Sequence, residues 1–359
     1  MKTNIIYASF GILSFLLTLI LIPFFKKIAV KVNLVDKPNY RKIHQDAVPL
    51  VGGIAIAITF FLVFAIQSLL FTYTKGYITI LVSAFILLIV GIIDDKMDVK
   101  AKYKLAIQLL LSFIIAASSI RITSLFGLFG IYEIAVWAQY VLTIIVITGV
   151  VNAFNLMDGV DGLVGGLSLL GFTMFLLSSF YFKDANLGYI SIVFIGAIIG
   201  FLRFNLSAKK IFMGDAGSLF LGFILISLGI QLMEKQSNVT NTSYGYGFIL
   251  LLAFFAIPVL DSLRVYMGRI KRGNSPFSAD KSHLHHLLLT AGLTHKKVSI
   301  VVVALSLLFY FIGFGLISFF SITLIIITTF LVFWSIIRFL LMIKKLEEWK
   351  NTLKKLEQR

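Results

Sequence analysis

The sequence has 359 residues, of which 59% are apolar and only 13% are charged, and its formal net charge is +16. A soluble fold is excluded, because soluble domains carry about 25% charged residues and because the apolar residues here fall in runs long enough to cross a bilayer. The chain has no cysteine, so it forms no disulfide and no thiolate metal site. In a membrane protein the positive charge reports orientation, and we expect no nucleic-acid partner.

The apolar runs follow one another without an internal repeat or a low-complexity linker, so we expect one integral-membrane domain over residues 1–343. A helix needs roughly 17–25 apolar residues to cross a bilayer core. The first run is too long for a signal-peptide core and lacks a small-residue cleavage site. We place eleven spans near residues 4–25, 50–72, 77–93, 105–120, 134–151, 163–182, 187–203, 217–233, 245–262, 298–318 and 321–343. The expected fold class is an all-α polytopic membrane protein.

Lysine and arginine residues are divided unequally between the two sides that eleven spans define. Most of them lie in the loops that follow odd-numbered spans and in the C-terminal tail. Cytoplasmic loops carry the excess of these residues in membrane proteins. We therefore expect the N-terminus outside, the C-terminus in the cytoplasm, and all the motifs described below on the cytoplasmic face.

The first cytoplasmic loop runs from Asp36 to His44 and leads to Gly52 and Gly53 at the start of the second span. It is basic, with Lys42 among its residues, and this charge alone is enough to hold the topology. The two glycines permit close helix packing or close approach of a ligand. Taken alone, the loop is weak support for a binding site.

The third span ends in a cluster of aspartates, Asp94, Asp95 and Asp98, which is followed by Lys104 and two further lysines. Adjacent carboxylates repel each other unless a cation or a shared proton relieves them. A stop-transfer cluster of charges is the structural interpretation. The functional interpretation is a divalent-metal or general-base site, with lysines ready to bind a phosphate.

Four polar residues recur at three-residue spacing after the fifth span, and on a helix they form one broad stripe: Asn152, Asn155, Asp158 and Asp161. No lysine or arginine lies between Gly149 and Phe182 to neutralise the two aspartates. An uncompensated acidic stripe at a membrane surface is a poor structural device. A bound cation is therefore the better interpretation.

A tight turn is expected just before the eighth span, at Phe212-Met213-Gly214-Asp215. It presents Asp215 next to small residues and a helix N-terminus, where the helix dipole alone also favours an aspartate. Helix capping and ligand binding therefore both stay open. Phe212 is suited to stacking on a base, and a buried anchor is equally consistent with the sequence.

Three of the five histidines in the chain fall within four positions: His283, His285 and His286. Zinc usually takes histidine pairs at i and i+4 or cysteine ligands, and the sequence has neither pattern here. Histidines together with the nearby Arg269 and Arg272 suit a phosphate or diphosphate. With the carboxylates described above, the equipment is typical of Mg²⁺-assisted phosphoryl transfer.

Residues 344–359 form a polar tail after the last span, which we expect to be a cytoplasmic amphipathic helix. Leu346, Trp349, Leu353 and Leu356 recur at spacings of three and four, with lysines between them. The pattern indicates a helix that lies on the anionic inner leaflet. A solvated helix that pairs with another subunit, as in a homodimer, fits it equally well.

In these motifs the chain resembles the polyprenyl-phosphate N-acetylhexosamine-1-phosphate transferases (glycosyltransferase family 4). The resemblance runs from Asp36 to His286 and rests on four ordered motifs: Asp94-Asp95, Asn152-x-x-Asn155-x-x-Asp158-x-x-Asp161-Gly162, Phe212-Met213-Gly214-Asp215 and His283-x-His285-His286. The spaced histidines are similar to those of the bacterial GlcNAc branch. The peptidoglycan branch usually has three consecutive histidines.

The resemblance implies a Mg²⁺-dependent enzyme, with Mn²⁺ as the alternative ion, and it implies roles position by position. Asp215 would ligate the metal, with Asn155 as a second ligand. Asp94 or Asp95 would act on the lipid phosphate, as a base or as an orienting group. Phe212 would stack on uracil. The other implied residues are Lys104, Asp158, His283, His285 and His286 in catalysis or at the diphosphate and sugar, and Lys42, His44, Asn152, Asp161 and Asn205 in substrate binding.

The implied reaction transfers GlcNAc-1-phosphate from UDP-GlcNAc to undecaprenyl phosphate, releases UMP, and begins a cell-envelope glycopolymer such as teichoic acid or O-antigen. The expected partners are a UDP-sugar, a polyprenyl phosphate and the bacterial plasma (inner) membrane. Another UDP-N-acetylhexosamine or UDP-MurNAc-pentapeptide stays open as substrate. A lipid-sugar transporter or flippase is the alternative from another class, but it would need ionisable groups at mid-membrane depth, and the spans are nearly free of charge.

Overall fold

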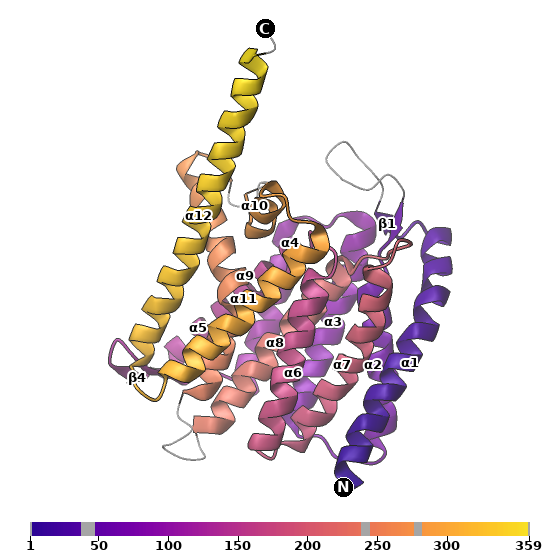
Figure 1. Ribbon diagram of the computed structural model, residues 1–359. Helices are drawn as coiled ribbons and strands as arrows, with labels where there is room; N and C mark the ends of the chain where they lie inside the picture. The colour runs from indigo at the N-terminus through magenta and orange to yellow at the C-terminus, as the bar shows by residue number, and fades with distance from the viewer. Residues whose placement is uncertain (1, 37–46, 238–244, 276–281, 358–359) are drawn as a thin grey trace.

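The structure is a computed structural model that describes residues 2–36, 47–237, 245–275 and 282–357. Two pairs of short antiparallel strands accompany the helices: β1 (Val35–Asp36) with β2 (Val48–Pro49), and β3 (Ser124–Leu128) with β4 (Ile131–Glu133). The described residues form twelve helices (Figure 1): α1 (Lys2–Lys31), α2 (Gly52–Ser68), α3 (Lys75–Met97), α4 (Ala101–Ala117), α5 (Val136–Asn155), α6 (Leu163–Tyr181), α7 (Ala185–Asn205), α8 (Gly214–Ser237), α9 (Tyr246–Lys271), α10 (Leu284–Thr290), α11 (His295–Leu316) and α12 (Ile322–Glu357).

Eleven of these helices coincide with the eleven predicted spans, and the short helix α10 is the additional one. Nine of the described helices are long and apolar enough to cross a membrane, while α2 and α4 have 17 residues each. Apolar runs fold as helices in a bilayer because a helix satisfies its own backbone hydrogen-bonding groups. The prediction of an all-α polytopic membrane protein is confirmed.

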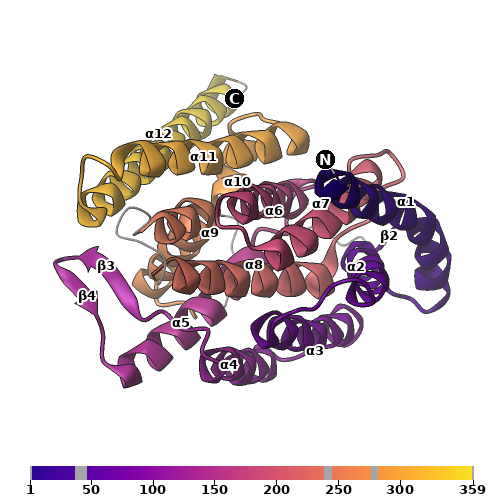
Figure 2. The ribbon, with the colours of Figure 1, turned by 90° about the horizontal axis from the view of Figure 1, so that it is seen from below.

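Helix α8 lies at the centre of the bundle and is surrounded by other helices (Figure 2). Its apolar segment is buried throughout, whereas only 28% of the corresponding segments of the peripheral helices α1 and α12 is buried. The side chains that cover α8 include Phe154 of α5 and Phe194 of α7, both fully buried, and the Phe194 ring lies 5.9 Å from the ring of Phe220 of α8. The N-terminal end of α8, which begins at Gly214, is therefore fixed by packing on several sides.

Helices α2 and α3 approach this end of α8 closely because glycines lie at the contacts. A Cβ on Gly53 would lie 2.1 Å from the Cα of Gly217, and a Cβ on Gly91 would lie 2.4 Å from the Cα of Ala216. Larger residues at Gly53 or Gly91 would push the helices apart. The close approach brings the C-terminal end of α3, with its aspartates, beside the start of α8.

The two termini lie at opposite ends of the bundle (Figure 1). α10, β1 and the C-terminal end of α12 share one end, and the β3–β4 hairpin lies at the other (Figure 1). The tail predicted for residues 344–359 is not a separate element, because its described residues continue α12. This helix is 36 residues long and projects beyond the bundle (Figure 1).

Candidate active site

A cavity of about 1290 Å³ lies at the end of the bundle that carries β1 and α10. Its wall is formed by the C-terminal end of α3, the N-terminal end of α8 and the loops before α6, α8 and α11. Of the predicted residues, the lining includes Asp94, Asp95, Asp158, Asp161, Asn205, Phe212, Asp215 and His286. It also includes residues that the sequence did not assign to a site: Lys210, Thr294, His295 and Lys296. Lys42 and His44 lie outside the described residues.

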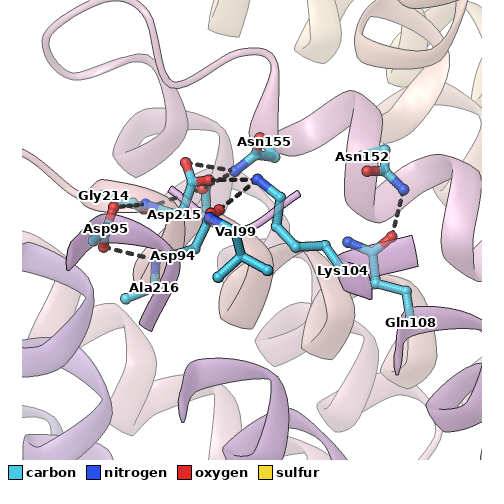
Figure 3. A network of polar contacts seen from close by, with 11 residues as sticks. Asp94, Asp95, Val99, Lys104, Gln108, Asn152, Asn155, Gly214, Asp215 and Ala216 are labelled. Carbon is cyan, nitrogen blue, oxygen red and sulfur yellow. Dashed lines mark hydrogen bonds and ion pairs between the residues drawn. The ribbon is translucent and has the colours of Figure 1, made fainter. Parts of the chain in front are cut away.

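Asp95 holds the start of α8 in place. Its carboxylate accepts hydrogen bonds from the backbone N–H of Asp215 at 2.8 Å and of Ala216 at 3.1 Å (Figure 3). A helix N-terminus leaves N–H groups without partners inside the helix, and a carboxylate there also meets the positive end of the helix dipole. A Cβ on Gly214 would lie 2.5 Å from Asp95 Oδ2, so only glycine fits at that turn. The cap of α8 is thus supplied by another helix and leaves Asp215 available.

Asp94 is tied to a lysine that it shares with Asp215. Lys104 Nζ lies 2.5 Å from Asp94 Oδ2 and 3.5 Å from Asp215 Oδ2 (Figure 3). The backbone N–H of Val99 donates to the other Asp94 oxygen at 2.9 Å. Asp98 ends α3 in a left-handed conformation with φ of 50°, and this sharp turn leads the chain into α4. The turn explains how Lys104, in the first turns of α4, reaches the carboxylates.

Asn155, the last residue of α5, joins the same cluster. Its side-chain amide donates to Asp215 Oδ1 at 3.1 Å and to Ser218 Oγ at 2.9 Å (Figure 3). Because both of its N–H groups are engaged, its carbonyl oxygen is left for other partners. The structure therefore brings together Asp94, Asp95, Lys104, Asn155 and Asp215.

Asn152 points away from this cluster. Its amide donates to Gln108 Oε1 at 2.6 Å (Figure 3) and to the carbonyl of Thr148 at 2.8 Å. Since Gln108 is a buried residue of α4, the contact ties α5 to α4. In this structure the polar group of Asn152 is engaged between helices.

The predicted helical stripe from Asn152 to Asp161 was wrong beyond Asn155, where α5 ends. The residues up to α6 form turns, and Gly162 has φ of 81°. Backbone in this left-handed region favours glycine, and Gly162 is the residue directly before α6. Asp158 and Asp161 therefore reach the cavity on turns, and not on one face of a continuous helix as predicted.

Asp158 lies in these turns, next to the cluster around Asp215. Burial, and after it the negative charges of Asp215 and Asp95, raise the pKa of Asp158 well above its usual value. A charge that is disfavoured in this way becomes favourable once a cation enters. The electrostatics of the cluster thus favour binding of a positive ion.

Asp161 is compensated by a cation from another loop, which corrects the expectation of an unneutralised stripe. Lys210 Nζ lies 2.9 Å from Asp161 Oδ2, and the His295 ring lies 3.9 Å from the same oxygen. Ser299 Oγ donates to the backbone carbonyl of Asp161 at 2.6 Å. Lys210 Nζ also lies 5.2 Å from the centre of the Phe212 ring. These contacts make a second polar group at the cavity, apart from the one around Asp215.

Asn205 is buried and holds two loops together. Its Oδ1 accepts the backbone N–H of Gly162 at 2.6 Å, and its Nδ2 donates to the carbonyl of Ile211 at 2.8 Å. Phe212 follows directly, and its backbone exchanges hydrogen bonds with Pro49 and Gly52, both at 2.9 Å. The position of the half-buried Phe212 ring at the cavity is therefore set by backbone contacts on both sides.

The histidine motif is anchored by Asp261, a fully buried residue of α9. Asp261 accepts from His283 Nδ1 at 2.8 Å, from the backbone N–H of Leu284 at 3.0 Å and from the Arg264 guanidinium at 2.6 Å. Arg264 also donates to the backbone carbonyl of Ser282. These bonds fix the chain that enters α10.

The three histidines differ in their access to the cavity. His283 and His285 are buried, and His286 lines the cavity wall. The His285 ring packs on the turn before α6, where a Cβ on Gly159 would lie 3.1 Å from His285 Nε2. Burial, and next the neighbouring His286, lower the pKa of His285 to about 3. His285 is therefore neutral at physiological pH.

The fold and the cavity define a polytopic membrane protein that gathers carboxylates and basic groups at one end of its helix bundle. The chain is 31% identical, over 87% of its length and 83% of the relative, to "Undecaprenyl-phosphate alpha-N-acetylglucosaminyl 1-phosphate transferase" of Yersinia pestis. It is 34% identical, over 84% and 81%, to "Probable undecaprenyl-phosphate N-acetylglucosaminyl 1-phosphate transferase" of Bacillus subtilis (strain 168). Residues 77–233 match the family model described as "Glycosyl transferase family 4". The chain belongs to this family, and the resemblance inferred from its motifs is confirmed.

Proposed function

We propose that the protein transfers GlcNAc-1-phosphate from UDP-GlcNAc to undecaprenyl phosphate, giving undecaprenyl-diphosphate-GlcNAc and UMP. The observation that carries the proposal is the bridge that Lys104 makes between Asp94 and Asp215. A lysine held between carboxylates suits a site where a metal ion and phosphate groups bind side by side. The named activity of the similar curated relatives supports the choice of substrates.

Asp215 and Asn155 are the residues that we propose to hold Mg²⁺, with Mn²⁺ as the alternative ion. Within the part of the chain that the structure describes, no three acidic or histidine side chains converge as a metal cage. Mg²⁺ needs no such cage, since it binds one or two carboxylates and completes its shell with water and substrate phosphate. The side chain of Asp215 is 35% exposed and so remains open to an ion. Bound there, Mg²⁺ would neutralise charge on the diphosphate.

We assign the lipid phosphate to Lys104 and Asp94. In the reaction an oxygen of this phosphate attacks the β-phosphorus of UDP-GlcNAc, the bond to the UMP oxygen breaks, and UMP leaves. A phosphate monoester already titrates near pH 6, so it needs no strong base, and Asp94 acts by holding Lys104. Asp95 has a positioning role, because both of its oxygens accept N–H groups of α8.

The nucleotide belongs, in this proposal, to the group around Phe212. The ring of Phe212 stacks on uracil, and Asp161 accepts a hydrogen bond from the uridine. Asn205 acts through its loops, because both ends of its amide are engaged by backbone groups. Lys210 contacts both Asp161 and the Phe212 ring, so it positions the two side chains that would bind the nucleotide.

The diphosphate and the sugar lie between these two groups. Of the three histidines in the motif, His286 is the one that lines the cavity, so we assign it to the diphosphate or the sugar. His283 and His285 are buried, and they hold the histidine motif in place through their contacts with Asp261 and with the turn at Gly159. Asp158 precedes Gly159, on which the His285 ring packs, and it interacts electrostatically with Asp215, so it adds negative charge that favours the metal.

The cavity end of the bundle is, we propose, its cytoplasmic face in a bacterial plasma membrane. The basic loops collect at this end, as the positive-inside rule requires, and the C-terminal end of α12 lies there as well (Figure 1). UDP-sugars are made in the cytoplasm, so a cytoplasmic cavity agrees with the proposed substrate. The product would begin a cell-envelope glycopolymer such as teichoic acid or O-antigen.

A UMP-release assay tests the function. Purified protein receives UDP-GlcNAc, undecaprenyl phosphate and Mg²⁺, and we expect release only when all three are present. The matched control is Asp184→Asn, an aspartate in an ion pair with Lys235 away from the cavity, which should keep the activity. If only another UDP-sugar works, the choice of substrate is wrong. If no UDP-sugar releases UMP, a lipid-sugar transporter becomes the better hypothesis.

A further inference from the structure

Lys104 is carried by a helix at the edge of the bundle. α4 lies beside α3 and α5 (Figure 2). Its other face carries exposed apolar side chains that would contact lipid: Leu109, Leu110 and Phe113. Because lipid chains are as apolar as these side chains, hydrophobic burial does little to fix the position of such a helix along its neighbours. Other contacts must therefore hold Lys104 at the cavity.

Buried polar side chains supply such contacts between α4 and α5. Gln108 Oε1 accepts a hydrogen bond from Asn152 Nδ2 at 2.6 Å (Figure 3). One turn farther from the cavity, Ser112 Oγ lies 3.1 Å from Thr148 Oγ1. The side chains of Gln108, Ser112 and Thr148 are all buried. Buried polar groups favour the one alignment of two helices in which they are paired.

The two pairs define an antiparallel register that leads to the cavity. From the outer pair to the Gln108–Asn152 pair, each helix moves four residues closer to the cavity end, backward along α4 and forward along α5. Residues that are four apart lie on the same face of a helix. The next turn on this face carries Lys104 on α4, and Asn155 follows Asn152 by three residues on α5.

Asp215 of α8 lies at this next level, between the two helices. Its Oδ2 is 3.5 Å from Lys104 Nζ, and its Oδ1 accepts the amide of Asn155 at 3.1 Å. The register of α4 against α5 therefore sets how Lys104 and Asn155 flank one carboxylate. A slip of α4 by one turn would move Lys104 by about 5.4 Å and would break its contacts with both Asp94 and Asp215.

We propose that Gln108 and Asn152 are positioning residues for the phosphoryl transfer and that they act through Lys104. This inference rests on the proposed function. The hydrogen bond between the two amides holds α4 in the register that places Lys104 beside Asp215 and the lipid phosphate. Displacement of a group by about 1 Å can lower a rate about 100-fold, so a contact outside the cavity wall can matter for turnover. Asn152 then needs no contact with the substrate, and Gln108, which belongs to none of the sequence motifs, gains a role.

Exchanging the two amides tests the contact. Gln108→Asn shortens one side of it by a methylene group, and kcat for UMP release should fall about tenfold while KM for the UDP-sugar stays within about twofold. Adding Asn152→Gln restores the combined length and should return kcat to within about threefold of wild type. Gln139→Asn is the matched control, because it makes the same change at the far end of α5, where the amide bonds to Arg121, and it should keep the wild-type kcat.

Two results of this exchange would overturn the proposal. Full activity of Gln108→Asn would show that the contact does not position Lys104. An exchanged pair that is no more active than Gln108→Asn would mean that Asn152 acts on the substrate directly.

A second measurement asks whether the effect passes through Lys104. In a Lys104→Met background, Gln108→Asn should lower kcat by less than about twofold, because the group that it positions is already gone. A further tenfold loss in that background would overturn the proposal, since Gln108 would then act on another part of the site. A merely structural role would lower the melting temperature in both backgrounds and leave kcat of the folded enzyme unchanged.

Cysteine pairs test the register without any activity, because the chain has no cysteine of its own. Ser112→Cys/Thr148→Cys replaces two hydroxyl groups that lie 3.1 Å apart, and it should form a disulfide under mild oxidation. Ser112→Cys/Ile144→Cys is one turn out of register and should cross-link at least about tenfold less. Equal yields overturn the register, whatever the protein catalyses. If the register holds but wild type releases no UMP from any UDP-sugar, the proposed function fails, and the role of Gln108 fails with it.

Discussion

Two aspartates near the same end of the bundle, Asp94 and Asp261, have opposite surroundings. Asp261 is fully buried, and a histidine, an arginine and a backbone N–H all donate to it. Asp94 accepts one backbone N–H, and otherwise it relies on Lys104, which Asp215 shares. One carboxylate is saturated by the protein, and the other belongs to a group with more negative than positive charge.

We expect this difference to separate a carboxylate that only supports the fold from one that belongs to the proposed reaction site. A saturated buried ion pair holds its neighbours in one geometry, and removal of one partner leaves an unpaired charge. A carboxylate cluster with a surplus of negative charge is stabilised by a cation. Once a cation is bound there, Lys104 can leave the carboxylates and bind a phosphate. Mutation of Asp261 should therefore mainly lower the stability of the fold, and mutation of the cluster around Asp94 should mainly lower turnover.

The largest effect is expected from Asp215→Asn. Asparagine keeps the size of the side chain and still accepts the amide of Asn155, but it loses the charge that we propose binds the metal. UMP release should fall about 1000-fold, in the range seen when transition-state electrostatics are removed. The melting temperature in detergent should change little. Retention of more than a tenth of the activity would contradict the assignment of Asp215.

Asp261→Asn should act on stability first. The change removes the negative charge that pairs with Arg264 and turns one of the two accepting oxygens into an N–H donor that faces another donor, and breaking one side of a buried pair costs about 3–5 kcal/mol. The matched variant Asp184→Asn breaks a pair whose lysine is 43% exposed, and its remaining oxygen can still accept the N–H of Leu187, so it should cost only about 1 kcal/mol. Thermal unfolding of both variants measures the difference. Equal losses would show that Asp261 is no special anchor.

The membrane architecture was predictable because composition and the length of apolar runs report the solvent around a helix. The motifs could also be placed at one end, since the distribution of lysine and arginine orders the loops. The sequence does not show which helix ends become neighbours. Asp95 caps α8, which begins 119 residues later at Gly214, and no local pattern near Asp95 indicates this.

The same limit explains the misinterpretation around Asp161. Three-residue spacing predicted a helix, but the glycine-rich turns end α5 at Asn155. The compensating Lys210 comes from another loop, so the absence of nearby basic residues was no sign of an unpaired charge. Asn205 was expected to contact the nucleotide, yet both ends of its amide are held by backbone groups. Contacts between residues far apart in the sequence, which the sequence does not show, explain the surroundings of both Asp161 and Asn205.

Lys104→Met tests whether the lysine between Asp94 and Asp215 acts in the proposed transfer. Methionine keeps the length of the side chain and removes the cation that joins Asp94 to Asp215. We expect kcat to fall about 100-fold, because the lysine would stabilise charge during transfer. Lys102→Met, two residues away and beside the Tyr103 ring, is the control and should keep its activity. A similar loss in both variants would point to a general effect of charge at this helix end.

Lys210→Met tests whether the second polar group binds the nucleotide. Lys210 positions Asp161 and the Phe212 ring, so its loss should raise KM for the UDP-sugar about tenfold and leave kcat nearly unchanged. Lys209→Met removes the exposed neighbouring charge and should change neither constant. A fall in kcat with an unaltered KM would move Lys210 from nucleotide binding to the chemical step.

The smallest effect is expected at His285, and it depends on pH. Its pKa is about 3 in the folded protein, and it returns to about 6.5 on unfolding. The depressed folded pKa makes no difference above pH 6.5, but below it the unfolded state takes up a proton that the folded state does not. Stability should thus fall by about 1 kcal/mol between pH 6.5 and 5.5. His285→Gln should remove this part of the acid sensitivity, and an equal fall in variant and wild type would assign it to other groups.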